Sequence, residues 1–153
     1  MFTESYNNIF AIDTKMFGFK NYQSCYLIVS DEIVLVDAGI PSQLQTFYNA
    51  LHSCGYSIQD VSRIIITHCE HPDHAGNAGA FVLENPNIKV YINLVGLEYL
   101  TVPSIERDER KKIMNPQTAA RFGIQKPVPE ENIFFLEDGE IIDIGSDQKL
   151  KFM

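Results

Sequence analysis

Three of the four histidines in the sequence lie within the seven-residue segment 68–74, which reads His-Cys-Glu-His-Pro-Asp-His. The same segment holds a thiol and two carboxylates. Imidazole and carboxylate groups together are ligands for zinc, iron or manganese. The proline restricts the backbone, so several donors are held close together at a small cost in conformational entropy. The residue types and their spacing therefore predict a metal-binding loop.

The residues on either side predict how this loop is positioned. Residues 63–67 form an apolar run that ends in a threonine, and residues 75–80 are small and include two glycines. A short apolar run bounded by polar residues is typical of a buried strand. We expect a helix over 77–84, ended by the Asn-Pro pair at 85–86. The loop is thus expected between the end of a strand and the start of a helix.

Strands and helices alternate along the rest of the chain. We expect strands over 8–13, 24–30, 33–37, 64–66, 89–92, 133–136, 140–143 and 149–152, and helices over 42–54, 94–100 and 103–122, the last broken at Pro116. Ser42 is a candidate N-cap, and Gly55 suits the left-handed residue after a helix. The pattern predicts one α/β (α+β) domain over residues 1–153, with helices flanking a mixed sheet.

Composition limits the classes of function. The chain has 153 residues, is 45% hydrophobic and carries a net charge of −8, which suits a globular domain and argues against a nucleic-acid binder. No apolar run approaches the about 20 residues of a membrane span. The N-terminus lacks the pattern of a secretion signal, and three scattered cysteines argue against a disulfide framework. We expect a cytoplasmic protein that acts on a small molecule, without nucleic-acid or membrane partners.

The spacing within the loop could serve two metal ions. In extended backbone, residues two apart point the same way, so Cys69 and His71 share a side, as do His71 and Asp73. Adjacent Asp73 and His74 diverge. Two metal ions about 3.5–4 Å apart can hold a hydroxide at neutral pH and polarise a carbonyl or phosphoryl oxygen. Asp73 is then a candidate ligand whose second oxygen orients the nucleophile.

Residues 67–77 resemble the signature of the metallo-β-lactamase superfamily, which includes glyoxalase II-like hydrolases and usually reads His-x-His-x-Asp-His. The strand that ends in Asp37-Ala38-Gly39 resembles that family's upstream landmark. The resemblance implies a four-layer αββα sandwich with one or two zinc ions, or iron or manganese, at the sheet edge. It implies a metal-bound hydroxide that attacks an ester, thioester or lactone carbonyl, with Asp73 as the catalytic residue. It also implies that Asp37 supports the loop by hydrogen bonding, while a turn-forming role explains Asp37 equally well.

The loop is one residue longer than the family signature, because it reads His-x-x-His-x-Asp-His. Counting forward from Thr67 makes His68 the first donor, whereas counting back from Asp73 puts Cys69 in that place. We favour His68, because imidazole is the usual ligand. The metal ligands implied by the resemblance are then His68, His71, Asp73 and His74.

A third alignment resembles the flavodiiron proteins, relatives within the same superfamily. It makes Glu70 a ligand of iron in a centre that reduces oxygen or nitric oxide. Such a role would need a flavin-bearing domain from elsewhere. Glu70 as a solvated loop acid is the alternative interpretation.

The family's remaining ligands come from the second half of a duplicated fold, and residues 138–145 resemble the stretch that leads into the first of them. The sequence ends at Met153, before any of them. Three explanations stay open. The chain is the N-terminal half of a longer hydrolase, it pairs with itself or a second chain through the strand edge at 149–153, or it is a non-catalytic binding module.

Tyr91, Tyr99 and residues 103–122 are candidates for the wall of a substrate cleft. Helical packing explains these residues just as well, so the sequence assigns them no role.

Overall fold

The computed structural model describes the backbone of residues 2–153 and the side chains of residues 7–104 and 107–153. Within these residues, seven strands form one sheet in the spatial order β1-β2-β3-β4-β5-β6-β7. The strands are β1 (Phe2–Tyr6), β2 (Ile9–Asp13), β3 (Ser24–Val29), β4 (Ile33–Val36), β5 (Arg63–Ile65), β6 (Lys89–Ile92) and β7 (Ile133–Phe135). Strands β1 to β4 pair antiparallel, and β4 to β7 pair parallel. The predicted mixed sheet is confirmed.

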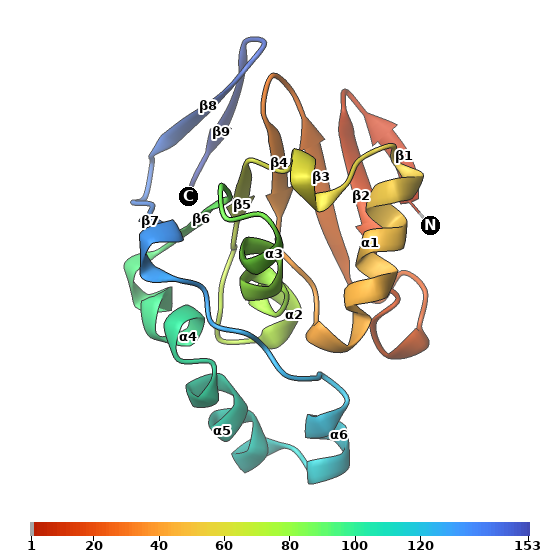
Figure 1. The fold of residues 1–153 in the computed structure, drawn as a ribbon, viewed down its shortest axis with the longest axis vertical. Coiled ribbons are helices and arrows are strands. Elements are labelled where there is room, and N and C mark those ends of the chain that lie inside the picture. The colour runs from red at the N-terminus through yellow and green to blue at the C-terminus, as the bar shows by residue number, and fades with distance from the viewer. Residues whose placement is uncertain (1) are drawn as a thin grey trace.

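The α-helices of the described chain are α1 (Leu44–Ser53), α2 (Pro72–Ala75), α3 (Ala78–Glu84), α4 (Leu97–Thr101), α5 (Ser104–Ile113) and α6 (Pro116–Ala120). Figure 1 shows α1 and α3 in front of the sheet, with α4, α5 and α6 grouped beyond its lower end. Leu35, Ile64 and Val90 are aligned across β4, β5 and β6 and are fully buried. They share an apolar cluster with Phe47 of α1 and Phe81 of α3. This core fixes the ends of β4 and β5 against the helices.

A hairpin packs against the opposite face of the sheet. Its strands, β8 (Ile141–Gly145) and β9 (Gln148–Lys151), pair antiparallel outside the main sheet. Ile142 and Ile144 of β8 belong to an apolar cluster with Val34 of β4. Burial of these side chains removes apolar surface from water, which holds the hairpin on the sheet.

The turn of the hairpin is tied to the β3–β4 turn by one carboxylate. Asp31 accepts a hydrogen bond from the Ser146 backbone N–H at 2.9 Å and another from the Ser146 hydroxyl at 2.6 Å. These hydrogen bonds favour the charged carboxylate and lower the pKa of Asp31 below its usual value. Pairing of the β9 edge with a second chain stays a prediction.

The start of α1 differs from the prediction. Ser42 lies inside a 3₁₀ turn over Pro41–Gln43, and Gln43, at the N-cap position, makes no side-chain capping hydrogen bond. Ser42 as the N-cap is wrong, because Pro41 begins a turn that runs directly into the helix. The end of the helix agrees with the prediction, since Gly55 has a φ of 86°.

The predicted break in segment 103–122 is confirmed, since α5 ends at Ile113 and α6 begins at Pro116. The Asn115 side chain caps α6 by accepting a hydrogen bond from the Thr118 N–H at 2.9 Å. Within residues 2–153, every helix is too short or too polar to span a lipid bilayer.

Candidate metal centre

The loop that carries the histidines begins where two parallel strands end side by side. Val36, the last residue of β4, is in register with Ile65, the last residue of β5. Asp37 follows β4 directly and Thr67 follows β5 by two residues, so both lie at the same sheet edge. The loop returns to this edge as well, because the Ala38 N–H donates to the His74 carbonyl at 2.6 Å. Side chains from both strand ends therefore meet the loop, as at the binding edge of other parallel sheets.

Asp37 links the strand end to the loop through four short contacts. Its carboxylate accepts hydrogen bonds from the Thr67 N–H at 2.9 Å and from the Thr67 hydroxyl at 2.9 and 3.0 Å. It also lies 2.7 Å from His74 Nδ1. Asp37 is buried and has a φ of 63°, in the left-handed region where only glycine, asparagine and aspartate are common. The structure thus places Asp37 where it positions the loop by hydrogen bonding.

His74 lies between two carboxylates. Its Nδ1 contacts Asp37, and its Nε2 lies 3.4 Å from Asp73 Oδ2. Burial disfavours the imidazolium, but the hydrogen bonds to Asp37 and Asp73 outweigh it and raise the pKa of His74 to about 9. Burial likewise disfavours the Asp73 carboxylate, yet the hydrogen bond to His74 lowers the Asp73 pKa overall. A carboxylate on Nδ1 fixes the ring and leaves Nε2 as the nitrogen for a metal ion.

The three imidazoles of the loop lie close together. The ring centroids of His68 and His74 are 3.7 Å apart, and those of His68 and His71 are 5.8 Å apart. The donor types fit zinc, iron or manganese. In the part of the chain that the structure describes, however, no three His, Cys, Asp or Glu side chains have the arrangement needed to hold one ion. The donors are gathered, and their side chains would have to turn toward one another to share a metal.

The backbone of the loop changes conformation at Pro72. His71 is extended, with φ −123° and ψ 135°, and Pro72 then opens the four-residue helix α2, which contains Asp73 and His74. The alternation of an extended strand therefore does not apply to Asp73 and His74, contrary to the prediction. The pattern was missed because four residues are too few to show helical periodicity.

Gln23, which the sequence did not single out, holds this helix. Its Nε2 donates to the Asp73 carbonyl at 2.9 Å and contacts Cys25 Sγ at 3.4 Å, and its Oε1 accepts a short hydrogen bond from the Thr14 hydroxyl. Gln23 and Asp73 are 50 positions apart in the sequence. No local pattern could have revealed this contact.

Cys69 and Glu70 differ from the histidines in environment. Cys69 is 2% exposed and belongs to the main apolar core. Burial, with the nearby Glu70 carboxylate, raises the pKa of the Cys69 thiol to about 12, which disfavours the thiolate that binds metals. Glu70 is exposed and accepts a hydrogen bond from the Cys69 N–H at 3.0 Å. These contacts favour His68 over Cys69 as the first donor.

A cavity of about 520 Å³ opens next to the loop. Its lining includes His71 and Asp73 of the loop, together with Tyr99 and Phe122. Tyr99 and part of segment 103–122, which are candidates for the wall of a substrate cleft, therefore do line a cavity next to the loop. Tyr91 does not line this cavity, since it packs on the opposite face of the sheet.

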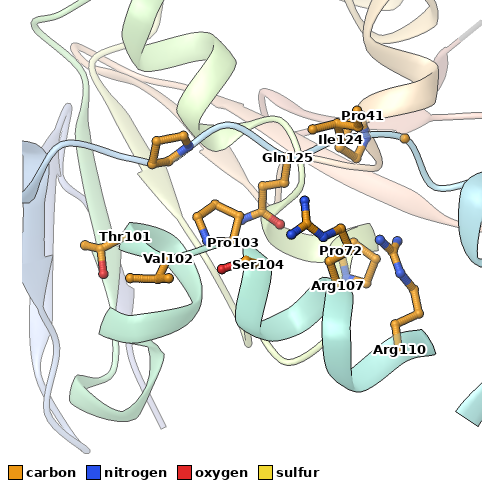
Figure 2. A pocket seen from close by; sticks show the side chains of 12 residues that line it. Pro41, Pro72, Thr101, Val102, Pro103, Ser104, Arg107, Arg110, Ile124 and Gln125 are labelled. Atoms are coloured by element: carbon orange, nitrogen blue, oxygen red, sulfur yellow. The ribbon is translucent and has the colours of Figure 1, made fainter. Parts of the chain in front are cut away.

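A second cavity, of about 260 Å³, shares Pro72 and Arg110 with the first. Figure 2 shows the Arg107 and Arg110 side chains rising from α5 toward Pro72 and Ile124. The two cavities are thus neighbours, and Arg110, which lines both, is itself buried.

Comparison with solved structures shows the fold. A B3 metallo-β-lactamase described as having an active-site glutamic acid is 20% identical, with a TM-score of 0.71 over 95% of this chain and 48% of its own. The metallo-β-lactamase GOB-18 from Elizabethkingia meningoseptica is 18% identical, with a TM-score of 0.70 over 95% of this chain and 47% of its own. BJP-1, a subclass B3 enzyme of Bradyrhizobium japonicum, is 17% identical, with a TM-score of 0.70 over 98% and 50%. The chain spans about half the length of these structures.

Comparison by sequence identifies the family. None of the curated proteins matches the chain. The family model of the metallo-β-lactamase superfamily matches residues 19–149, which include both the Asp37 turn and the histidine loop. This chain belongs to the metallo-β-lactamase superfamily.

Proposed function

We propose that this chain carries the metal-binding loop of a metal-dependent hydrolase that cleaves an ester, thioester or lactone. The observation that supports this most is the contact of Asp37 with both Thr67 and His74, which joins the ends of β4 and β5 to the histidine loop. A structural turn would not need an imidazole 2.7 Å from a buried carboxylate. That pairing is typical of protein metal sites.

The ligands we propose are His68, His71, Asp73 and His74. Nitrogen and carboxylate donors of this kind suit one or two zinc ions, with iron or manganese as alternatives. A divalent ion at this loop supplies Lewis acidity toward a carbonyl oxygen and toward water.

Two carboxylates at the loop would orient the metal ligand His74 and the attacking water molecule. Asp37 accepts a hydrogen bond from His74 Nδ1–H, so that Nε2 is the nitrogen that would bind a metal ion after losing its proton. Asp73, whose pKa is lowered, has an ionised carboxylate at neutral pH that can orient a water molecule by accepting its hydrogen bond. One B3 metallo-β-lactamase is described as having an active-site glutamic acid, so a glutamate in an active site of this fold is compatible with hydrolysis. Glu70 therefore gives no reason to prefer iron redox chemistry.

A non-catalytic binding module is the second candidate. It is favoured by the absence, among the side chains of residues 7–104 and 107–153, of three donors already arranged around one point. A module of this kind would take up no metal, whereas the hydrolase requires it.

Metal content separates the two candidates. The purified full chain is loaded with Zn²⁺ or Mn²⁺, dialysed, and measured by elemental analysis. A variant with His71→Ala and Asp73→Asn should lose the metal, whereas His52→Ala, an exposed histidine of α1, should keep it. Equal metal content in the double variant and the wild type would refute the site. No metal uptake by the wild-type chain would support the binding module instead.

A further inference from the structure

The cavity of about 520 Å³ beside the loop has the size of a small-molecule site. His71 and Asp73 belong to its lining, so a molecule that occupies the cavity lies near the proposed metal ligands. Most of the other lining residues take no part in the proposed reaction. Their chemistry bears on what the substrate carries.

The lining includes apolar and aromatic side chains that we call the apolar wall: Met16, Tyr22, Ile113, Met114 and Phe122. Two side chains of this wall are already held in place by packing within the fold. Met16 and Phe122 are buried in a small apolar cluster, and the Phe122 ring meets Phe17 edge to face at 4.9 Å. The wall is partly open to solvent, because the side chains of Tyr22 and Ile113 are in residues that are 65% and 75% exposed. Exposed apolar side chains at the mouth of a cavity favour an apolar occupant.

The charges around the cavity disfavour an anionic occupant. Glu70, Asp73 and Glu109 bring carboxylates to its lining. The Glu109 carboxylate, which accepts a hydrogen bond from the Tyr99 hydroxyl at 3.1 Å, would repel a second anion. Arg110 is the cation in the described lining, and its guanidinium is buried and stacks 4.7 Å from the centre of the Phe122 ring. An uncharged group therefore fits this space better than a carboxylate or phosphate.

We infer that this cavity binds an uncharged apolar acyl group, aliphatic or aromatic, of the molecule whose carbonyl faces the loop. This inference rests on the proposed hydrolase function and names its substrate class. The substrate is an ester, thioester or lactone of a medium-length apolar acid. A short acyl group would leave the apolar wall uncovered, and an anionic tail would be repelled by the carboxylates of the lining.

Binding of a non-hydrolysed probe tests this without catalysis. Octanamide, acetamide and octanoate are titrated into the full chain without added metal, and binding is followed by NMR chemical-shift changes. Octanamide should bind at least about tenfold more tightly than acetamide, because burial of a few methylene groups is sufficient for that factor. Octanamide should also bind more tightly than octanoate. Equal affinity for octanamide and acetamide overturns the apolar site, and tighter binding of octanoate overturns the argument from charge.

Two exposed isoleucines provide a matched pair of variants. Ile113→Asp places a charge on the apolar wall and should lower octanamide affinity at least about fivefold, whereas Ile124→Asp should leave it unchanged. Ile124 is 80% exposed and does not line this cavity. An equal loss in both variants counts against the site. If Ile113→Asp fails to fold, the comparison of the three probes with the wild type still decides.

The outcomes separate this inference from the proposed function. Selective octanamide binding in a chain that never takes up metal supports the acyl site and refutes the hydrolase. Metal-dependent turnover of short and long esters at equal efficiency, with no octanamide binding, refutes the acyl site and leaves the hydrolase standing.

Discussion

Replacing Asp37 with alanine should loosen the histidine loop from the sheet edge. The substitution removes the carboxylate that contacts the Thr67 N–H, the Thr67 hydroxyl and His74 Nδ1. Loss of one partner from a buried hydrogen-bonded ion pair costs about 3–5 kcal/mol. We expect about 3 kcal/mol, at the lower end of that range, because the His74 side chain keeps 22% exposure and a second carboxylate at 3.4 Å.

Two further variants at this position separate the backbone from the hydrogen bonds. With a φ of 63°, a side chain at position 37 is disfavoured by about 1–2 kcal/mol relative to glycine. Asp37→Gly should therefore be destabilised by about 1 kcal/mol less than Asp37→Ala. Asp37→Asn should lose the least, because asparagine tolerates this backbone and its amide oxygen can still accept from Thr67.

Urea unfolding of the metal-free chain measures these differences, and metal titration adds a second readout. The loss of a carboxylate behind a ligating histidine typically weakens metal affinity about 10–100-fold. A change below about 1 kcal/mol for Asp37→Ala, within the range of an ordinary surface substitution, would refute the role of this network in holding the loop. Unchanged metal affinity in all three variants would refute its role in presenting His74.

Three other substitutions test separate contacts. Gln23→Ala removes the hydrogen bond to the Asp73 carbonyl and should lower the free energy of unfolding by about 1 kcal/mol. An unchanged urea midpoint would show that this hydrogen bond does not stabilise the position of α2. Gly96→Ala places a methyl group against the Ile92 side chain and 2.9 Å from Cys69 Sγ, and the overpacking should lower the thermal midpoint at a cost of about 1–3 kcal/mol. A wild-type midpoint would contradict the observed packing. Asp31→Asn should be less stable than the wild type near neutral pH, and because the native pKa of Asp31 is lowered, this difference should vanish as the pH falls through that pKa. A difference that persists in urea unfolding at low pH would contradict the carboxylate's role.

The frame of the site could be predicted from the sequence because its signals are local. Buried strands at 24–30, 33–37 and 89–92 show as continuous apolar runs bounded by polar residues, and they match β3, β4 and β6 within one residue. The loop between β5 and α3 follows from the same reasoning. The Asp-x-Gly turn and the histidine spacing added the family, which the match over residues 19–149 confirms.

The parts that could not be predicted depend on contacts between distant residues. Gln23 reaches Asp73 across the fold, and nothing near either residue in the sequence indicates that they meet. The two candidate tyrosines looked alike, yet Tyr99 faces the cavity beside the loop and Tyr91 the opposite side of the sheet. A strand places alternate residues on opposite faces, but only the packed fold shows which face carries the site.

The histidine loop is fastened at both ends by backbone groups. The Asp37 N–H donates to the Ile65 carbonyl at 2.9 Å, and the Ala38 N–H donates to the His74 carbonyl at 2.6 Å. None of these ties involves an ion, so the chain differs from a zinc finger, whose fold collapses when its metal is withdrawn. A chelator should accordingly remove a bound metal ion without unfolding the protein. Uptake of an ion at the proposed site would then have to order only a few imidazole and carboxylate rotamers on a scaffold that is already formed.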